Sequence, residues 1–166
     1  MASPVETPIG RLTAEHFRPE QIRHRAIVGP KFLYALFHTN DDMHVVSRTF
    51  MEFVRDGDLP YRRLLLNEHV VDEAATRLKK QASIQHATKF LATLTDSQLY
   101  QLEYVPEEIF ERAATTFTEW TDLDASFTDF VVAEHMNELG VDHIVTYDRH
   151  YDAFDVATLP YTTSSI

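Results

Sequence analysis

The chain has 166 residues, a length that fits one domain with a buried core. It contains no cysteine, which excludes disulfides, thiolate metal sites and a cysteine nucleophile, so a metal ion would need oxygen or imidazole ligands. The formal charge of −11, with four lysines and eleven arginines, describes an acidic surface that repels nucleic acid unless a basic patch or a bound cation offsets it. The same bias suggests a halophilic protein from a high-salt cytoplasm.

The sequence gives no sign of a membrane segment or of secretion. No apolar run approaches the ~20 residues that a membrane-spanning helix needs, and the N-terminal stretch lacks the apolar part of a signal peptide. We therefore expect a cytoplasmic protein without a membrane contact. Residues 1–24 contain three prolines and one short helical pattern at Thr13–Phe17, and are predicted to be an extension outside the core. The domain then covers residues 25–160, and residues 161–166 form a polar tail.

From residue 26 onward, strand patterns alternate with helix patterns. Short apolar or β-branched runs predict strands at 26–28, 64–66, 99–105, 141–146 and 156–159. Apolar residues at helical spacing predict helices at 31–37, 41–55, 67–80, 83–94, 106–120 and 126–140. Strands separated by helices indicate an α/β domain with a central, mainly parallel sheet flanked by helices.

The stretch from Ser126 to His150 reads as a helix followed by a strand, with an acid at each end. Asp129 falls in the first turn of the helix, Gly140 is a natural C-cap, and Asp148 directly follows the strand. In open α/β sheets, ligands bind outside the carboxyl ends of the strands, where the following helices also begin. Both carboxylates can therefore reach one crevice, where paired carboxylates suit a hard divalent cation such as Mg²⁺.

Each of these acids also has a purely structural explanation. Ser126 and Asp129 fit an acidic variant of the capping box, in which Asp129 serves only the helix N-terminus. Asp148 could equally be a turn residue, since aspartate is common in turns. Spacing within the sequence does not decide between these roles and a metal site.

Three segments resemble the PIN-domain ribonucleases, including the VapC-type toxins. They are FLYALF after the first strand, HVVDEAATRL with its glutamate early in a helix, and LDASFTDFVVAEHMNELGVDHIVTYDRHYDAF near the end. The resemblance implies a PIN-like three-layer domain and an acidic cluster that binds Mg²⁺ or Mn²⁺ and hydrolyses RNA phosphodiester bonds with metal-activated water. The catalytic and metal-binding residues that it carries over are Glu73, Asp129 and Asp148.

One of these residues has a simple alternative role. Glu73 could be an exposed helix residue paired with Arg77 four positions further on. Its assignment to the cluster therefore depends on the resemblance.

The chain departs from the family pattern at the end of the first strand. The family has an aspartate there, in a sequence such as Asp-Thr-Ser, whereas this chain has Gly29-Pro30-Lys31. A carboxylate is lost and Lys31 adds an opposing charge, so we predict weaker cation binding. Asp124 or Asp152 could compensate, and Gly29→Asp is predicted to restore metal affinity.

The resemblance also implies partners: an RNA substrate, a small antitoxin protein and a second copy of the chain in a homodimer. The alternative is a catalytically degenerate PIN-like domain that binds RNA or a protein partner, and a third is an unrelated α/β protein whose acids are caps. The apolar run Phe32–Phe37 could support a protein interface or belong to the core. Five basic residues could contact phosphates or form a solvated charged face. They are Arg23, His24, Arg25, Lys79 and Lys80.

Overall fold

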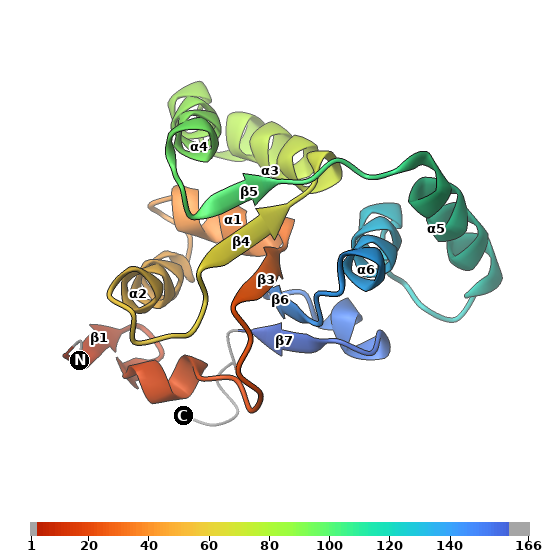
Figure 1. The fold of residues 1–166 in the computed structure, drawn as a ribbon. Helices are drawn as coiled ribbons and strands as arrows, with labels where there is room; N and C mark the ends of the chain where they lie inside the picture. Colours follow the sequence, from red (N-terminus) through yellow and green to blue (C-terminus); the bar gives the residue numbers. More distant parts are fainter. Residues whose placement is uncertain (1–2, 160–166) are drawn as a thin grey trace.

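A five-stranded sheet in which every neighbouring pair of strands is parallel forms the centre of the fold (Figure 1). The structure is a computed structural model that describes residues 3–159, so the predicted tail 161–166 lies outside the described residues. The strand order is β5-β4-β3-β6-β7. The strands are β3 (Arg25–Val28), β4 (Arg63–Leu66), β5 (Tyr100–Leu102), β6 (His143–Val145) and β7 (Ala157–Leu159).

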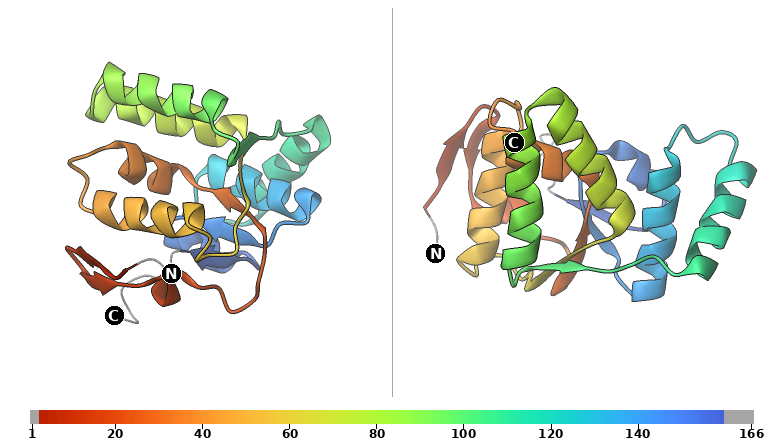
Figure 2. Two further views of the ribbon diagram at one scale, coloured as in Figure 1. Left: turned by 60° about the vertical axis from the view of Figure 1, so that its left-hand side comes forward. Right: turned by 90° about the horizontal axis from the view of Figure 1, so that it is seen from above.

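Six α-helices flank this sheet within the described part of the chain, and the predicted three-layer α/β architecture is confirmed. They are α1 (Pro30–Phe37), α2 (His44–Arg55), α3 (Glu68–Gln81), α4 (Ile84–Asp96), α5 (Glu107–Glu119) and α6 (Phe127–Leu139). In both views of Figure 2, α5 lies against α6 on one side of the molecule, and α3 lies against α4 on another. None of the described helices has the length and apolar character required to cross a membrane.

Most predicted elements occur where the sequence places them, but three strands are shorter. The strand predicted at 99–105 covers only Tyr100–Leu102, the one predicted at 141–146 covers only His143–Val145, and the one predicted at 156–159 covers Ala157–Leu159. Helix α2 begins at His44, because the carboxylate of Asp41 accepts a hydrogen bond from the backbone N–H of Met43 and so closes a turn before the helix.

The N-terminal residues add no strand to the central sheet, yet they contribute to its core. β1 (Val5–Thr7) and β2 (Gly10–Leu12) form an antiparallel hairpin that the sequence pattern did not predict, and a 3₁₀ helix, η1 (Ala14–Phe17), follows it. Leu12 and Phe17 are buried in the main hydrophobic cluster. The ring centroid of Phe17 lies 5.6 Å from that of Phe50 on α2. This contact packs the N-terminal segment against the domain.

The two central strands and the first helix supply the middle of the core. All apolar residues of β3 and β4 are buried, as expected for strands covered on both faces. Residues Phe32 to Ala35 of α1 are also buried, and Leu36 and Phe37 pack against the same cluster. Phe32 to Ala35 therefore belong to the core, and Leu36 and Phe37 are partly buried against it.

The order of the strands places a topological switch point beside β3. The chain continues from β3 to β4 and β5 on one side, then crosses over to β6 and β7 on the other side. Val28 pairs with Val145, so β3 and β6 end at the same level. In open parallel sheets, ligands bind at the carboxyl ends of the strands that flank such a point. The fold thus directs attention to the residues that follow Val28 and Val145.

Candidate metal centre

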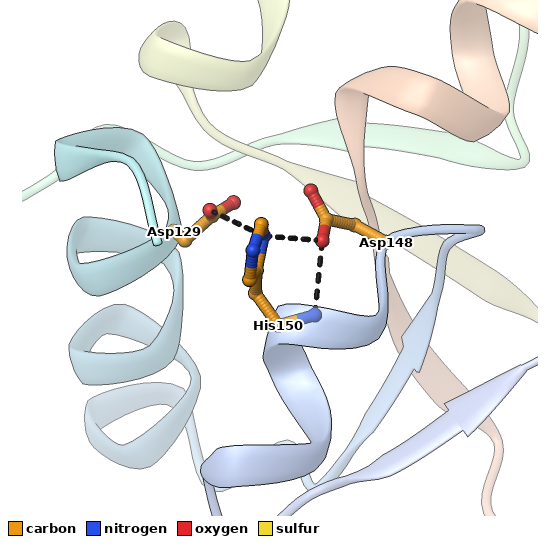
Figure 3. A group of neighbouring side chains, drawn as sticks. All are labelled: Asp129, Asp148 and His150. Carbon is orange, nitrogen blue, oxygen red and sulfur yellow. Dashed lines mark hydrogen bonds and ion pairs between the residues drawn. The ribbon is translucent and has the colours of Figure 1, made fainter. Parts of the chain in front are cut away.

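The two predicted aspartates lie close together at the carboxyl ends of β3 and β6 (Figure 3). Asp129 belongs to the first turn of α6, and its side chain is only 6% exposed. Asp148 lies three residues beyond β6, at the N-cap of the 3₁₀ helix η2 (Arg149–Ala153), and its side chain is 13% exposed. One ligand atom each of Asp129, Asp148 and His150 lies within 4.8 Å of the other two.

Asp129 has the structural role that the sequence allowed, and it faces the centre as well. Its Oδ2 accepts a hydrogen bond from the backbone N–H of Ser126 at 2.8 Å, and its own N–H donates to Ser126 Oγ at 3.2 Å. These two bonds form a capping box. Because only one carboxylate oxygen serves the cap, and each oxygen has two lone pairs, the residue can cap the helix and still bind a cation.

Asp148 is held by three groups. Its Oδ1 accepts a hydrogen bond from the backbone N–H of His150 at 3.0 Å and lies 2.8 Å from the imidazole Nδ1 of the same residue, while its Oδ2 lies 3.1 Å from Nζ of Lys31. Burial raises the pKa of this carboxyl, but the bond from His150 and the neighbouring Lys31 outweigh burial, and the pKa is lowered overall. Asp148 is thus ionised across the neutral pH range.

His150 is a member of the centre that sequence reasoning missed. Figure 3 shows its imidazole between the carboxylates of Asp129 and Asp148. Nδ1 lies 3.9 Å from Asp129 Oδ2, and its short contact with Asp148 lacks hydrogen-bond geometry. Its position two residues after Asp148 could have identified it. An aspartate at a turn often accepts a hydrogen bond from the backbone N–H two residues later, which places the side chain of that later residue near the carboxylate.

Glu73, the third predicted acid, borders the centre from α3. It lines the same pocket of about 330 Å³ as Asp129 and Asp148. The pKa of Glu73 is raised, first by burial and then by the negative charges of Asp129 and Asp148. The Glu73 carboxylate therefore interacts electrostatically with Asp129 and Asp148, although it does not belong to the group of ligand atoms within 4.8 Å that Asp129, Asp148 and His150 form.

Tyr151 adds a buried polar atom behind the carboxylates. The residue is fully buried, and its hydroxyl has no hydrogen-bond partner of good geometry among the described residues. Burial and the nearby charges of Asp129, Asp148 and Glu73 raise the pKa of this phenol well above its ordinary value. The hydroxyl is therefore neutral, and it is available as a donor to the cluster.

Gly29 cannot simply be restored to an acid, because Thr146 occupies the space. A Cβ atom at Gly29 would lie 2.9 Å from Thr146 Oγ1 and 3.1 Å from Thr146 Cβ. Thr146 is buried, and its Oγ1 accepts a hydrogen bond from the backbone N–H of Asp148 at 3.0 Å. Restored metal affinity in Gly29→Asp stays a prediction, and the substitution would require Thr146 to shift.

The two candidate replacements for the missing acid differ in position. Asp124 lines the same pocket as Asp129 and Asp148, from the loop before α6. Asp152 is exposed, pairs with Arg149 at 3.8 Å and accepts a hydrogen bond from Thr158. Of the two, only Asp124 lies where it could add a carboxylate to the centre.

Three of the five basic residues lie at the opposite edge of the sheet. Arg23 binds the carboxylate of Asp142, His24 contacts the carbonyl oxygen of Pro60, and Arg25 donates to that of Leu139. These residues precede or begin β3, whereas the centre lies beyond its carboxyl end. Lys79 and Lys80 are exposed in the last turn of α3.

A larger hollow of about 450 Å³ near the C-terminal end of α6 does not offer a comparable site. Among the described residues, its acids do not belong to a group of three possible ligand atoms that lie within 4.8 Å of one another, whereas Asp129, Asp148 and His150 do. The cluster around Asp148 therefore remains the better candidate.

The donor set fits one divalent cation. Two ionised or cap-forming carboxylates and one imidazole nitrogen within 4.8 Å are hard and borderline ligands of the kind that bind Mg²⁺ or Mn²⁺. The buried Tyr151 hydroxyl, which interacts with Asp129 without good hydrogen-bond geometry, is a further polar group beside the carboxylates. Glu73 and Asp124 on the rim could complete the coordination through water.

The fold, compared with known structures, is that of VapC-type toxins. The Mycobacterium tuberculosis toxin VapC20, which cleaves the sarcin–ricin loop, has a TM-score of 0.68 at 21% identity, over 79% of this chain and 98% of that chain. VapBC2 from Rickettsia felis, solved with a DNA fragment from its promoter, has a TM-score of 0.59 at 10% identity, over 81% of this chain and 97% of that chain. FitAcB from Neisseria gonorrhoeae has a TM-score of 0.55 at 13% identity, over 82% of this chain and 97% of that chain.

No protein-family model and no curated protein matches the chain by sequence. The similar structures confirm the resemblance to PIN-domain proteins at the level of the fold.

The crowding at Gly29 gives a testable prediction. Gly29→Asp should lower the free energy of unfolding by about 1–3 kcal/mol, because the new Cβ must push aside a buried side chain. Thr146→Ala in the same chain should recover part of this loss, which chemical denaturation of both single variants and the double variant would measure as a coupling. If Gly29→Asp is as stable as the wild type and shows no coupling with Thr146→Ala, the contact does not constrain this position.

Proposed function

We propose that this protein is a metal-dependent ribonuclease of the PIN type that hydrolyses RNA phosphodiester bonds, as the toxin of a toxin–antitoxin pair. The observation that carries the proposal is the convergence of Asp129, Asp148 and His150 at the switch point of a VapC-like fold. In this proposal Asp129 and Asp148 hold Mg²⁺ or Mn²⁺. A cation held there would neutralise phosphate charge and lower the pKa of its bound water.

The protein's own residues have distinct roles in this proposal. Asp148 supplies a fully ionised carboxylate, since its pKa is lowered. Glu73 lines the same pocket as the two aspartates, where its carboxylate is placed to accept a proton from the attacking water. The imidazole of His150 favours Mn²⁺ relative to Mg²⁺, because Mg²⁺ prefers oxygen ligands.

A groove beside the centre supports RNA as the substrate. It lies along α3, has a volume of about 400 Å³, and includes Glu73, Arg77, Lys80 and Thr128. Glu73 lines both this groove and the pocket of the centre, so the two are adjacent. On an otherwise acidic chain, Arg77 and Lys80 could contact RNA phosphates next to the scissile bond.

The alternative is a catalytically degenerate PIN-like domain that binds RNA or a protein partner. Two observations favour it: the carboxylate expected at Gly29 is absent, and Lys31 neutralises Asp148. This alternative keeps the fold and the groove but not the reaction.

A cleavage assay separates these functions. Wild-type protein should cleave RNA when Mn²⁺ or Mg²⁺ is present, and EDTA should abolish the activity. Asp129→Asn and Asp148→Asn should each lower the rate by at least roughly a hundredfold, because each removes a charged ligand. Asp142→Asn, far from the centre, serves as the matched control and should cleave at the wild-type rate. Cleavage that survives EDTA and Asp148→Asn would contradict the metal mechanism, whereas RNA binding without cleavage would support the degenerate domain.

A small antitoxin and a homodimer are the proposed protein partners. The family resemblance implies both, and the described residues include large exposed apolar side chains that a partner could cover. These are Leu102, Tyr104, Phe110, Phe117 and Trp120, on β5, on α5 and near them.

We expect the purified chain to elute as a dimer in size-exclusion chromatography with light scattering. The acidic surface suits a cytoplasm of high salt content, so the measurement belongs in concentrated KCl, which screens repulsion between the copies. The same protein in dilute buffer is the control for the effect of salt. Elution as a monomer at every protein concentration in KCl would argue against the homodimer.

A further inference from the structure

Both oxygen atoms of the Asp148 carboxylate are engaged by the protein itself. The backbone N–H of His150 donates to Oδ1 at 3.0 Å, the Nδ1 of His150 lies 2.8 Å from the same oxygen, and the ammonium of Lys31 lies 3.1 Å from Oδ2. A cation that binds at Asp148 therefore either shares this carboxylate with the ammonium of Lys31 or takes its place, and the two positive charges repel each other. The position of Lys31 thus affects how tightly the cation binds.

Lys31 is the partner that can leave. Its side chain is 45% exposed, so the ammonium can move into water on its flexible four-carbon stem. The side chain of His150 is about as exposed, at 40%, but its Nδ1 is itself within the group of possible ligand atoms. Opening the contact with His150 would remove a ligand, whereas opening the contact with Lys31 would expose one.

The position of Lys31 in its helix is unfavourable by local rules. It follows Pro30 in the first turn of α1, where no acidic residue is present. The N-terminus of a helix carries partial positive charge, so a lysine there is repelled by the helix dipole. The neighbouring carboxylate of Asp148 offsets this repulsion, which indicates that Lys31 belongs to the centre and not to the helix cap.

The surroundings indicate that the centre is built to take a ligand. The Tyr151 hydroxyl is fully buried beside the carboxylates and has no hydrogen-bond partner of good geometry among the described residues. Gly29 brings no side chain into the space between the strands, and Thr146 fills it. The charge missing at Gly29 and the charge added by Lys31 both make the cluster less negative.

We propose that Lys31 is a displaceable internal counter-ion, which occupies Asp148 in the absence of metal and sets the affinity of the centre for divalent cations. This inference rests on the metal centre of the proposed function. The ammonium compensates the Asp148 carboxylate when no metal is bound, and it moves into solvent when a cation takes that oxygen. Lys31 then offsets one carboxylate charge when metal is scarce, and it raises the metal concentration that half-saturates the centre.

Titration with Mn²⁺, followed through the electron paramagnetic resonance signal of the free ion at constant ionic strength, tests this directly. Lys31→Met keeps most of the apolar stem and should bind Mn²⁺ roughly three- to tenfold more tightly than the wild type, since one opposing charge is gone. Lys31→Arg keeps the charge and should stay near the wild-type affinity. Lys89→Met removes an exposed lysine from α4, changes the net charge equally, and should have no such effect. Thermal unfolding confirms that each variant is folded.

The outcomes also separate this inference from the proposed function. Equal or weaker Mn²⁺ affinity in Lys31→Met, together with metal-dependent RNA cleavage, overturns the inference and leaves the ribonuclease. Tighter affinity in Lys31→Met that disappears on adding Asp148→Asn supports the inference, and it does so even if no variant cleaves RNA, in which case only the ribonuclease function fails. Absence of Mn²⁺ binding in every variant overturns both.

Discussion

The parallel pairing of β3 with β6 is the constraint on which the rest of the candidate centre depends. Val28 pairs with Val145, and the backbone N–H of Gly29 donates to the carbonyl oxygen of Val145 at 2.8 Å. This register brings the segments after both strands to one level. A shift of the register would separate Lys31 on α1 from Asp148 after β6, although each element could still form by itself.

Within this frame, the same carboxylates serve the fold and the chemistry. Asp129 caps α6 while it faces the cluster, and Asp148 caps η2 while it pairs with Lys31. The backbone bonds hold the side chains in fixed positions, which is what a coordination site needs before the ion arrives. A structural role for an aspartate is therefore no argument against a functional one, and the two explanations offered by the sequence are compatible.

The element types were predictable because their patterns are strong, whereas the details of the centre were not. The alternation of buried runs and helical stripes predicted the sheet and the helices, and the ends of the strands predicted Asp129 and Asp148 as neighbours. The hairpin Val5–Leu12 was missed because two three-residue strands leave almost no periodic pattern. The packing of Phe17 into the core depends on contacts distant in sequence, which no local pattern contains.

The same reason explains why His150 and Tyr151 were missed. Both follow Asp148 in a 3₁₀ turn whose side-chain directions arise only when β6, α6 and η2 are assembled. The contact between Gly29 and Thr146 likewise depends on the register between two strands far apart in the chain. Sequence could identify the missing acid, but only the structure shows that its space has been filled and that a lysine holds the neighbouring carboxylate.

Anomalous diffraction from crystals equilibrated with Mn²⁺ would test the central claim most directly. The account predicts one strong manganese peak between Asp129 and Asp148, at about 2.0–2.6 Å from an oxygen of each, with the ammonium of Lys31 moved away from Asp148. Manganese bound elsewhere on the acidic surface, or an intact contact between Lys31 and Asp148 at saturating Mn²⁺, would contradict it.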